Sequence, residues 1–390
     1  MSEAGKRPKL IYLVSEDWYF VSHRLSLAVA AKEAGYDVVV AARVREAGAE
    51  IRNAGLRLIP IDFERSRLSP LAELKTLASL IALYRREAPD LVHHIAIKPV
   101  VYGSIAARAT RTRGVVNALM GLGFVFSSNS RKALTLKPFV SVLLRRCLSR
   151  PRTRTIVQNR DDYALLRDLH IAPADTLRLI PGSGVDPDLY QANPSPQEVP
   201  PLVLLPSRLL KAKGVLEFVE AAQRLKSTGL AARFALAGEP DPSNPDSISK
   251  QELLAIQNGG AVEYLGWQRD IPKLLAEATV VCLPSYYGEG IPKVLIEAAA
   301  SARAIITTDM PGCREIVTPG VNGWLVPPRD AAALAEAIRE AIANPARCFE
   351  YGLRGREMVE ASFSLQRILR STLEVYDELA STLPPGSAQA

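Results

Sequence analysis

Residues 284–300 read PSYYGEGIPKVLIEAAA, and this stretch predicts a tight turn between a strand and a helix. The apolar segment TVVCLPS leads into it, and KVLIEAAA contains strong helix formers without a breaker. Gly288 and Gly290 allow the backbone to bend tightly and to approach a ligand closely, while Pro292 suits the first position of a helix. Because the free N–H groups of a first helical turn favour an anion, this unit predicts a site for a negatively charged ligand.

Two glutamates, Glu289 and Glu297, stand eight positions apart in this stretch. Glu289 falls in the turn, where its carboxylate could accept hydrogen bonds from sugar hydroxyls. Glu297 falls about a turn and a half into the helix, where it could meet the two hydroxyls of a ribose. Two glutamates at such a spacing also arise by chance, as solvated charges that the helix dipole favours. The stretch alone is compatible with both interpretations.

The same alternation of strand-like and helical segments continues along most of the chain. Long helical patterns occupy residues 23–35 and 71–88. Apolar, strand-like runs occur at residues 9–15, 37–44, 56–63, 90–96, 114–120 and 153–159, and again at 202–208, 232–238, 262–267, 279–285, 304–310 and 323–327. This alternation predicts an α/β fold in which parallel sheets carry helices on both faces.

A proline-rich segment divides the two series of strands. QANPSPQEVPP, residues 191–201, contains four prolines and predicts a linker. With 390 residues, 48% of them hydrophobic, the chain can form two ordinary cores. We therefore expect two doubly wound, Rossmann-like domains at residues 1–190 and 202–365 that face each other across a cleft. A helix at 366–380 and a tail at 381–390 follow them.

Composition limits the partners and the compartment. The net charge of +7 favours an anionic partner such as a nucleotide, a lipid phosphate or a membrane surface. The four cysteines have neither paired nor metal-type spacing, which favours reduced thiols in a cytoplasmic protein. The N-terminal residues show no secretory signal, and no apolar run is long enough to span a membrane. We expect a cytoplasmic protein that is soluble or peripheral to the membrane.

The charges of the first domain are strongly uneven. Between Leu91 and Arg160 there is no acidic residue, but there are thirteen lysines and arginines. Residues 131–154 mix cations with apolar residues at roughly helical spacing, as an interfacial helix does, and each cation near an anionic leaflet contributes about 1 kcal/mol. The same helix could instead pack its apolar face on the first domain. A nucleic-acid groove is not expected, because aromatic residues are not interleaved with the cations.

A second cluster of candidate site residues follows the opening strand of the second domain. Ligands in doubly wound sheets bind beyond the carboxyl ends of the strands. Arg208 and Lys213 lie there, in SRLLKAKG, residues 207–214. Two such cations could clamp a diphosphate and neutralise the charge that develops when it leaves a sugar carbon. A basic helix start on the surface is the alternative.

These motifs resemble those of the retaining glycosyltransferases of family 4, which have the GT-B fold of two facing Rossmann-like domains. Residues 289–297 match the family's E-x7-E motif, and SRLLKAKG is similar to its GRL-x2-KG pattern with Ser207 in place of the usual glycine. IPGSGVD, residues 180–186, resembles the family's IPNGVD turn with one extra residue. The resemblance covers most of the chain and implies that the helix at 366–380 returns to the first domain.

The resemblance implies a nucleotide-sugar site in the second domain, with Arg208, Lys213 and Glu289 as its catalytic residues. The base would bind in the loop after VEYLGW, although Trp267 could equally be a core residue. The residues expected to bind the donor are Glu297, Gly290, Ile291, Pro292, Lys293, Gly238, Leu265 and Trp267. The neighbouring loop EPDPSNPDSISK, residues 239–250, has no interpretation at this level.

The first domain is expected to bind the acceptor. Ser22 is expected to cap a helix whose first turn carries His23 and Arg24, and the SHR sequence resembles bacterial family members that build lipid-linked polysaccharides. His23 could donate to a phosphate or be structural. Lys98, in a KP pair, could meet the acceptor's diphosphate or be a solvated lysine at a helix entry.

The chain departs from the family where many members carry a histidine near the sugar carbon. The corresponding segment, VVNALMGLGFVF, has no histidine, and Met120 or Gly121 falls at that place. No catalytic histidine can therefore be carried over. Gly121 and Gly123 instead predict a close approach of the backbone to the acceptor.

The resemblance implies a retaining hexosyltransferase that moves a sugar from a nucleotide-diphosphate sugar, a UDP-sugar, to a polyprenyl-diphosphate-linked saccharide. It would act as a peripheral protein at the inner face of the cytoplasmic membrane. No Asp-x-Asp metal motif stands out, so we expect protein cations to stabilise the charge and no cofactor to be needed. Two alternatives remain: a sugar-nucleotide epimerase or phosphorylase of the same fold, and a non-enzymatic scaffold that binds membranes or polyanions.

Overall fold

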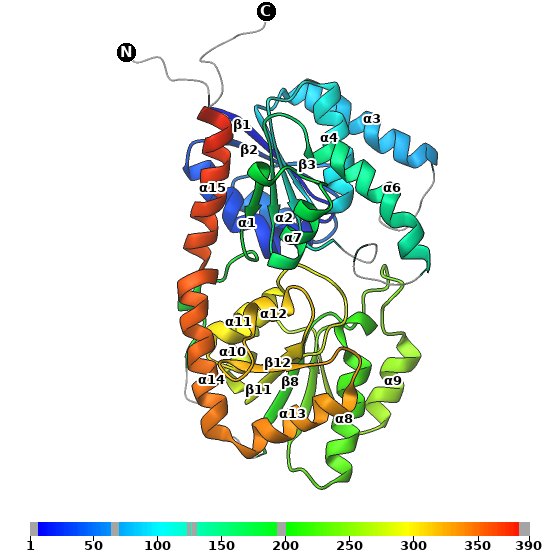
Figure 1. Ribbon diagram of the computed structural model, residues 1–390, viewed down its shortest axis with the longest axis vertical. Helices are drawn as coiled ribbons and strands as arrows, with labels where there is room; N and C mark the ends of the chain where they lie inside the picture. Colours follow the sequence, from blue (N-terminus) through cyan, green and yellow to red (C-terminus); the bar gives the residue numbers. More distant parts are fainter. Residues whose placement is uncertain (1–6, 64–69, 123–125, 127–130, 193–199, 382–390) are drawn as a thin grey trace, which may run out of the picture. The chain divides into compact units, whose positions relative to one another are not determined.

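Two compact units make up the computed structural model, which describes residues 7–63, 70–122, 126, 131–192 and 200–381 (Figure 1). Unit 1 consists of residues 1–183 and 368–390, and unit 2 consists of residues 184–367. Each unit contains one parallel sheet with helices on both faces. The α/β architecture that the alternating pattern predicted is therefore confirmed.

The sheet of unit 1 has the strand order β3-β2-β1-β4-β5-β6-β7, and all its strands are parallel. Its central strands are buried along their whole length, which explains why they read as continuous apolar runs. The sequence predicted all of them except the last, whose three residues are too few for a recognisable pattern. The strands are β1 (Lys9–Leu13), β2 (Asp37–Ala42), β3 (Arg57–Pro60), β4 (Leu91–Ile95), β5 (Gly114–Leu119), β6 (Thr153–Val157) and β7 (Leu177–Leu179).

Helices pack on both faces of this sheet (Figure 1). They are α1 (Asp17–Glu33), α2 (Gly48–Asn53), α3 (Pro70–Glu87), α4 (Ile97–Ala109), α6 (Arg131–Leu148), α7 (Arg160–Asp168) and α15 (Leu365–Ser381). One core contains side chains of α1, α2 and α15. The cores on the other face contain side chains of α3, α4, α6 and α7. The C-terminal helix α15 is thus part of the core of unit 1.

Helix α1 begins earlier than the sequence predicted. Its first residue is Asp17, which follows Glu16 in an extended conformation, so Ser22 lies inside the helix and does not cap it. The Asp17 carboxylate accepts hydrogen bonds from the backbone N–H groups of Arg45 (2.7 Å) and Ala47 (3.0 Å). The local sequence WYFV favours an extended segment, but these contacts with the loop after β2 fix the helix start at Asp17.

Buried polar contacts hold α15 on the sheet of unit 1. The Tyr376 hydroxyl donates to the hydroxyl of Tyr12 at 3.0 Å and lies 2.6 Å from Nδ1 of His93. Because that hydroxyl has one proton, Nδ1 of His93 is the donor in the second contact. Burial lowers the pKa of His93 well below its ordinary value, so the imidazole is neutral. Nearby, Glu378 forms an ion pair with Arg154 at 2.5 Å.

The sheet of unit 2 has the strand order β10-β9-β8-β11-β12-β13 and is also parallel. Its strands are β8 (Leu202–Pro206), β9 (Arg233–Ala237), β10 (Glu263–Gly266), β11 (Val280–Leu283), β12 (Ala304–Thr308) and β13 (Gly323–Val326). The helices are α8 (Val215–Ser227), α9 (Lys250–Asn258), α10 (Ile271–Glu277), α11 (Lys293–Ala300), α12 (Cys313–Ile316), α13 (Ala331–Ala343) and α14 (Pro345–Met358). The sequence predicted each of these strands.

Unit 1 ends at residue 183 and unit 2 begins at residue 184, whereas the sequence placed the end of the first domain at residue 190. The backbone N–H of Val185 donates to the carbonyl of Phe363 (3.1 Å), and the N–H of Leu365 donates to the carbonyl of Val185 (2.8 Å). These bonds tie residues 184–190 to the end of unit 2. Of the expected linker, residues 193–199 lie outside the described part of the chain.

We predict that replacing Tyr376 by phenylalanine destabilises unit 1. The change removes the hydroxyl that joins His93 and Tyr12 and leaves buried polar atoms without a partner, which costs about 1–3 kcal/mol. Thermal or denaturant unfolding measures the loss. Tyr163→Phe is the control, because Tyr163 is half-buried in the same unit, and it should change stability by less than about 0.5 kcal/mol. Equal effects of the two substitutions would contradict the prediction.

Candidate functional site

The strand order of unit 2 reverses between β8 and β11, which are neighbours in the sheet. In doubly wound sheets, the loops beyond the carboxyl ends of such strands form ligand sites. The loop after β8 carries Arg208 and Lys213, and the loop after β11 carries Glu289. The fold therefore places these three predicted residues at one edge of one sheet.

Lys213 and Glu289 form a close ion pair. The lysine Nζ lies 2.7 Å from Oε1 and 2.6 Å from Oε2 of the glutamate, and the two side chains are only 16% and 21% exposed. The Ser285 hydroxyl lies 3.0 Å from Oε1 of Glu289 and 3.1 Å from the carbonyl oxygen of Ala212. Glu289 is therefore not a solvated surface charge. The pair places a cation and a strong hydrogen-bond acceptor at one point.

A buried thiol lies beside this pair. Cys313, the first residue of α12, is completely buried. Burial raises the pKa of Cys313 to about 11, and the Glu289 carboxylate adds to the shift. The thiol is therefore protonated at neutral pH and adds no charge near the ion pair.

Two glycines allow the loops of this edge to lie directly against one another. Gly214 has φ +75°, and a Cβ there would collide with the carbonyl oxygen of Pro284. Gly312 has φ +83°, and a Cβ there would collide with the carbonyl oxygen of Gly290. The loops after β8, β11 and β12 are thus packed backbone to backbone, which leaves no room for any other residue type.

Arg208 pairs with an acidic residue of the uninterpreted loop at residues 239–250. Its guanidinium lies 2.9 Å from Oδ2 of Asp241. Burial raises the pKa of Asp241, but hydrogen bonds from Ser243 and the charge of Arg208 outweigh it, so the pKa stays below its ordinary value. Asp241 is therefore negatively charged, and an anionic ligand at Arg208 would compete with it.

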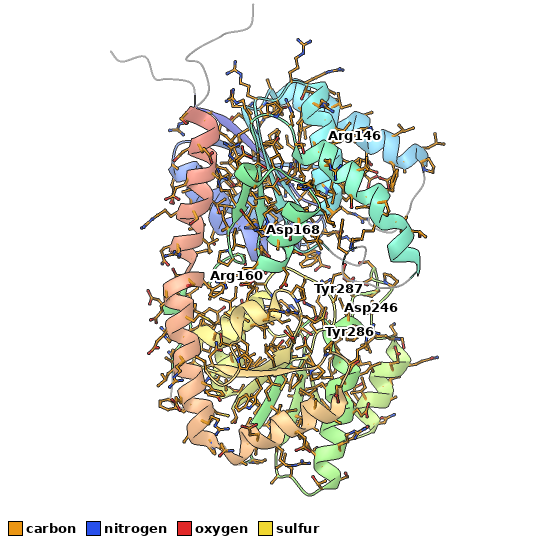
Figure 2. The ribbon with its side chains drawn as sticks, viewed as in Figure 1. Arg146, Arg160, Asp168, Asp246, Tyr286 and Tyr287 are labelled. Atoms are coloured by element: carbon orange, nitrogen blue, oxygen red, sulfur yellow. The ribbon has the colours of Figure 1, made fainter. Side chains whose placement is uncertain are left out.

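The same loop is bonded to the backbone of the loop after β8. Oδ2 of Asp246 accepts a hydrogen bond from the N–H of Ala212 (2.7 Å), and its carbonyl accepts one from the N–H of Lys211 (2.8 Å). The N–H of Tyr286 donates to the carbonyl of Ala212 at 3.0 Å. Asp246 and Tyr286, both labelled in Figure 2, thus hold the same residue from two loops. The residues next to Lys213 are fixed before any ligand binds.

Glu297 is mostly buried on α11, and its Oε1 lies 3.3 Å from Nζ of Lys293. The helix begins at Lys293, so Pro292 is its cap and not its first residue. Tyr190 is a neighbour of Glu297 that the sequence did not reveal. Burial is the main cause that raises the pKa of Tyr190, and the negative charge of Glu297 raises it further. Glu297, like Glu289, is therefore not a solvated charge. Ile291, Gly290 and Pro292 are buried in the turn before the helix.

The remaining predicted donor-binding residues follow β9 and β10. Gly238 has φ +133°, and a Cβ there would collide with the carbonyl oxygen of Ser207, so the close approach of two loops requires a glycine. Trp267 is 60% exposed, with the guanidinium of Arg269 5.6 Å from its ring centre. The interpretation of Trp267 as a core residue is therefore wrong. Leu265 packs at the edge of the core.

In unit 1, Lys98 is held by neighbouring side chains and is not a solvated lysine. It lies in the first turn of α4, and its Nζ is 2.9 Å from Oε1 of Glu73. Glu73 also accepts a hydrogen bond from the hydroxyl of Tyr102 at 2.5 Å. The lysine Nζ lies 5.8 Å from the ring centre of Phe63. An anion that reaches Lys98 would have to compete with Glu73.

Arg24 and His23 lie in the middle of α1 and have different surroundings. Arg24 is 4% exposed, and its guanidinium donates to Sδ of Met120 at 2.8 Å. His23 is half-buried, and its ring stacks on that of Tyr19 with the centres 4.3 Å apart. Met120 directly follows β5, the strand after which many family members carry a histidine. An arginine therefore lies where the resemblance led us to look for a histidine.

Gly121 and Gly123 follow Met120. Gly121 has φ +101°, a conformation that glycine adopts readily. Gly123 lies outside the described residues. The histidines of β4 do not replace the missing one, because Nδ1 of His94 lies 2.8 Å from Oδ1 of Asn117 and its Nε2 lies 3.0 Å from the hydroxyl of Tyr84. Burial lowers the pKa of His94 to about 4, and it is a structural residue.

Helix α6 packs on unit 1 with one side and leaves its other side exposed. Leu144 and Leu148 are buried against unit 1, so one side of the helix packs on the domain. Its other side exposes apolar residues, with Phe139 69% exposed, and basic residues such as Arg146 (Figure 2). Across the described residues, no helix has both the length and the apolar composition needed to cross a membrane.

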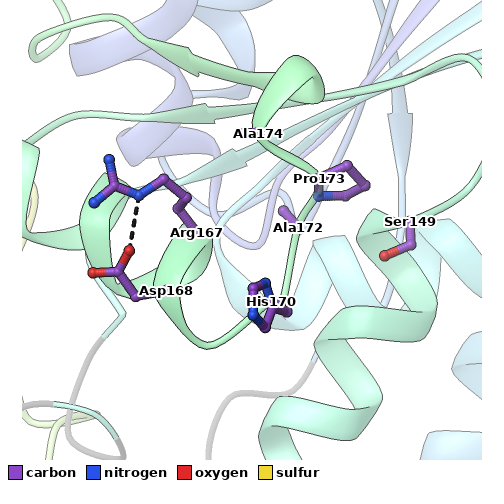
Figure 3. A pocket seen from close by; sticks show the side chains of 7 residues that line it. All are labelled: Ser149, Arg167, Asp168, His170, Ala172, Pro173 and Ala174. Atoms are coloured by element: carbon purple, nitrogen blue, oxygen red, sulfur yellow. Dashed lines mark hydrogen bonds and ion pairs between the residues drawn. The ribbon is translucent and has the colours of Figure 1, made fainter.

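A cavity of about 620 Å³ in unit 1 lies apart from the predicted residues (Figure 3). It is lined by Ser149, Arg167, Asp168, His170, Ala172, Pro173 and Ala174. Figure 3 shows the Arg167–Asp168 ion pair, whose nitrogen and oxygen are 2.8 Å apart, at one side of it. None of the predicted site residues lines this cavity, so it gives no support to the acceptor assignment.

The sequence contains one Asp-x-Asp pair, Asp186-Pro187-Asp188, which is not among the motifs described above. Oδ1 of Asp186 accepts a hydrogen bond from the N–H of Asp188 at 3.2 Å and caps a short 3₁₀ turn. This aspartate therefore has a structural role in the turn. In the described ranges, no three His, Cys, Asp or Glu side chains are grouped in a way that could hold a metal ion.

Several residues at this edge of unit 2 were not singled out from the sequence: Tyr190, Asp241, Asp246, Ser285 and Gly312. Ser285 and Gly312 follow strands β11 and β12, so the rule that ligands bind beyond strand ends could have found them. Asp241 follows β9 at the same distance as Gly312 follows β12, whereas Tyr190 and Asp246 have no such signal. Their roles depend on contacts with segments far away in the sequence.

Most of the chain matches known protein families. Residues 9–159 match the family described as "Glycosyl transferase 4-like", and residues 200–344 match "Glycosyl transferases group 1". The matched ranges contain nearly all the residues that the sequence singled out.

Individual proteins are also similar. The N,N'-diacetylbacillosaminyl-diphospho-undecaprenol alpha-1,3-N-acetylgalactosaminyltransferase of Campylobacter jejuni is 29% identical over 81% of this chain and 84% of that protein. The UDP-Gal:alpha-D-GlcNAc-diphosphoundecaprenol alpha-1,3-galactosyltransferase of Escherichia coli is 26% identical over 70% of this chain and 71% of that protein. The crystal structure of Anabaena HepE with UDP and glucose has a TM-score of 0.76 at 19% identity, over 97% of this chain and 100% of HepE.

We predict that Gly312→Ala strongly destabilises unit 2. An alanine Cβ would collide with the carbonyl oxygen of Gly290. A non-glycine residue at this positive φ also destabilises the fold by about 1–2 kcal/mol. At roughly 2–4 °C per kcal/mol for a domain of this size, the melting temperature should fall by several degrees. The control is Gly355→Ala, where a Cβ meets Ala299 at an ordinary 3.5 Å. Equal melting temperatures for the two variants would refute the backbone contact.

Proposed function

The chain belongs to the family 4 glycosyltransferases and has their GT-B fold, and we propose that it transfers a sugar, with retention of its anomeric configuration, from a UDP-sugar to a polyprenyl-diphosphate-linked saccharide. The family and the fold agree with the resemblance of the motifs. The names of the two bacterial relatives, both transferases with undecaprenyl-diphosphate-linked acceptors and one with UDP-Gal, support the acceptor and donor classes. Membership of an enzyme family disfavours the non-enzymatic scaffold.

The observation that carries the proposal is the Lys213–Glu289 ion pair at the switch point of unit 2, with Arg208 in the same segment after β8 as Lys213. A nucleotide sugar presents a diphosphate next to a ring of hydroxyls. Two cations and a carboxylate within one short stretch of sheet edge match these two features. The diphosphate would lie at the cations and the sugar at Glu289.

Donor binding in this proposal exchanges ion pairs that the protein already holds. Diphosphate oxygens displace Asp241 from Arg208 and share Lys213 with Glu289. The carboxylate of Glu289 then accepts hydrogen bonds from sugar hydroxyls, while the Ser285 hydroxyl at 3.0 Å keeps it oriented. Each new contact joins an ion to a hydrogen-bonding group, and such bonds are about twice as strong as neutral ones.

The nucleoside end of the donor would extend along the same edge of unit 2. Glu297 accepts hydrogen bonds from the ribose, and the ion pair with Lys293 holds its carboxylate in place. The exposed indole of Trp267 offers an apolar face to the base, near Leu265 and Gly238. The turn Gly290–Pro292 presents backbone groups to the phosphates at the start of α11.

The chemical step requires stabilisation of a leaving diphosphate. As the bond between the sugar carbon and the phosphate oxygen breaks, negative charge grows on that oxygen, and Arg208 and Lys213 neutralise it. The acceptor hydroxyl attacks from the same face and passes its proton to the departing phosphate oxygen. The protein's contribution is charge stabilisation and positioning, and no covalent sugar–protein intermediate is invoked.

Unit 1 would supply the acceptor side. Its proposed acceptor-binding residues are His23, Arg24, Lys98 and Gly121, together with Gly123 outside the described residues. The apolar and basic surface of α6 would hold the protein at an anionic membrane, where a polyprenyl acceptor is embedded. The enzyme in this proposal is cytoplasmic and peripheral to the inner face of the cytoplasmic membrane.

We predict that Arg208→Ala lowers turnover by roughly 10²-fold or more, because one charge-stabilising donor is lost from the transition state. Release of UDP from a panel of UDP-sugars, with a polyprenyl-diphosphate-linked acceptor present, measures the rate. The control is Arg224→Ala, which removes an exposed arginine paired with Glu220 on α8 and should leave turnover unchanged. An unimpaired Arg208→Ala enzyme would remove the proposed role of this residue.

The same assay separates the alternatives. An epimerase would convert a UDP-sugar into an isomer without any acceptor. A transferase would not, so incubation with a UDP-sugar alone should give no isomer. A UDP concentration of 100 times the dissociation constant should stabilise the protein by about 2.7 kcal/mol in a thermal-shift measurement. Formation of an isomer, or no stabilisation by any UDP-sugar, would contradict the proposed transfer.

We predict that α6 binds anionic vesicles through Phe139 and its basic neighbours. Phe139→Ser should weaken binding to vesicles that contain phosphatidylglycerol about 10-fold or more, because burial of a phenylalanine is worth roughly 1.5–3 kcal/mol. Flotation with phosphatidylglycerol or with phosphatidylcholine alone, at low and high salt, measures binding. Leu254→Ser, at an exposed site on α9 in unit 2, is the control. Equal binding of both variants would exclude α6 as the membrane contact.

A further inference from the structure

Helix α1 turns an unusual face towards the core of unit 1. Its buried residues are Asp17, Phe20, Arg24, Leu27, Ala28 and Ala31. From Phe20 onward their spacing is that of an apolar helix stripe, but one position of the stripe holds an arginine. Arg24 is 4% exposed, so a permanently charged guanidinium lies in the interior of the unit.

The partners of this guanidinium are weak. One terminal nitrogen donates to Sδ of Met120 at 2.8 Å, and a thioether sulfur is a poor hydrogen-bond acceptor. The Nε atom is buried and has no hydrogen-bond partner among the described residues. No carboxylate in the described part of the chain forms an ion pair with Arg24. A buried charge with such partners is costly to the fold.

Another buried arginine, Arg303, shows how a guanidinium with a purely structural role is hydrogen-bonded. Arg303 is 1% exposed in unit 2. Its guanidinium donates to the carbonyl oxygens of Ser301 at 2.9 Å and Ala278 at 3.3 Å. Arg303 therefore has oxygen acceptors within its own unit, whereas Arg24 has a sulfur atom.

Arg24 also lies where a ligand would be expected. The strand order of unit 1 reverses between β1 and β4, and α1 follows β1 while Met120 follows β5. The arginine thus belongs to the carboxyl edge of the sheet, near its switch point. Met120, which the guanidinium contacts, is half-buried, so this contact lies close to the surface. Met120 has a flexible side chain that can move aside.

The groups around Arg24 offer no anion of their own. Tyr12, His93 and Tyr376 are the neighbours on the sheet and on α15, and they are bonded to one another. All three are neutral at physiological pH. Among the described residues, therefore, no group balances the charge of Arg24, and an anionic ligand could supply the balance.

We propose that Arg24 forms the base of a phosphate-oxyanion site in unit 1, and that its guanidinium exchanges the sulfur of Met120 for phosphate oxygens when the ligand binds. A guanidinium can give two parallel hydrogen bonds to a phosphate, which suits this exchange. The identification of the ligand as the acceptor's diphosphate rests on the proposed function. The existence of the oxyanion site does not.

The test compares the Arg24→Met variant with the natural protein, both as the full chain. Methionine has a similar length and no charge, so without ligand the variant should melt at the same temperature or higher. Inorganic pyrophosphate, added with UDP at saturation to occupy the donor site, should raise the melting temperature of the natural protein but not that of the variant. UDP alone should stabilise both equally. Arg85→Met, which removes an exposed cation on α3 of the same unit, should behave as the natural protein.

Further arms distinguish the sources of the oxyanion and guard against a folding failure. Farnesyl diphosphate should bind more tightly than pyrophosphate if an isoprenoid-linked ligand is the natural one, and equal affinities would assign a free phosphate. Arg24→Lys keeps the charge without the planar fork, so its affinity for pyrophosphate should fall about 10-fold or more and remain measurable. In the transfer assay, Arg24→Lys should raise KM for the acceptor and leave KM for the UDP-sugar unchanged.

Three results would overturn the proposal: no pyrophosphate binding beyond the donor site, an undiminished pyrophosphate shift in Arg24→Met or Arg24→Lys, or a large fall in the ligand-free melting temperature of Arg24→Met with the shift retained. The last would make Arg24 a structural residue. A failure to bind UDP or to transfer sugar would remove the proposed function, while the pyrophosphate result would still decide whether the oxyanion site exists.

Discussion

The ion pair between Lys213 and Glu289 is the contact on which the site of unit 2 depends. It joins loops that are 76 residues apart in sequence, and it exists because β8 and β11 are neighbours in the sheet. Both side chains are mostly buried, so the pair is stronger than a surface ion pair but also costs desolvation. A carboxylate held in this way can be released only when another anion reaches the lysine. In the proposed function, binding of a diphosphate at Lys213 would therefore be linked to release of the Glu289 carboxylate for the sugar.

Much of this arrangement could be predicted from the sequence, for identifiable reasons. Buried parallel strands produce continuous apolar runs, so twelve of the strands in the two sheets could be found, while the three-residue β7 could not. Arg208 and Glu289 follow strands, and that position alone marks them as candidates. The partners of these residues could not be predicted, because Asp241 meets Arg208 only through the folded path of a loop. The prediction of where α1 begins was wrong, because the contacts that fix Asp17 come from the backbone of Arg45 and Ala47, beyond the next strand.

The two units treat their candidate anion-binding cations differently. In unit 2, Arg208 and Lys213 each have a carboxylate partner, so the two positive charges are balanced. In unit 1, Lys98 has Glu73, but among the described residues Arg24 has a sulfur atom and a set of neutral rings. A balanced site costs little to keep but must exchange partners with its ligand. An unbalanced site is costly to keep and gains more when the ligand arrives.

The glycines of unit 2 have a consequence for how related chains can be recognised. Gly214, Gly238 and Gly312 each lie against a carbonyl oxygen from another loop, at positive φ, so no other residue fits there. The two-glutamate spacing occurs often by chance, but three obligatory glycines at fixed distances from it do not. A search pattern that combines them with Lys213 would test the packing of the whole sheet edge. A chain that carries the glutamates without these glycines would need a different backbone at this edge, however similar its remaining sequence.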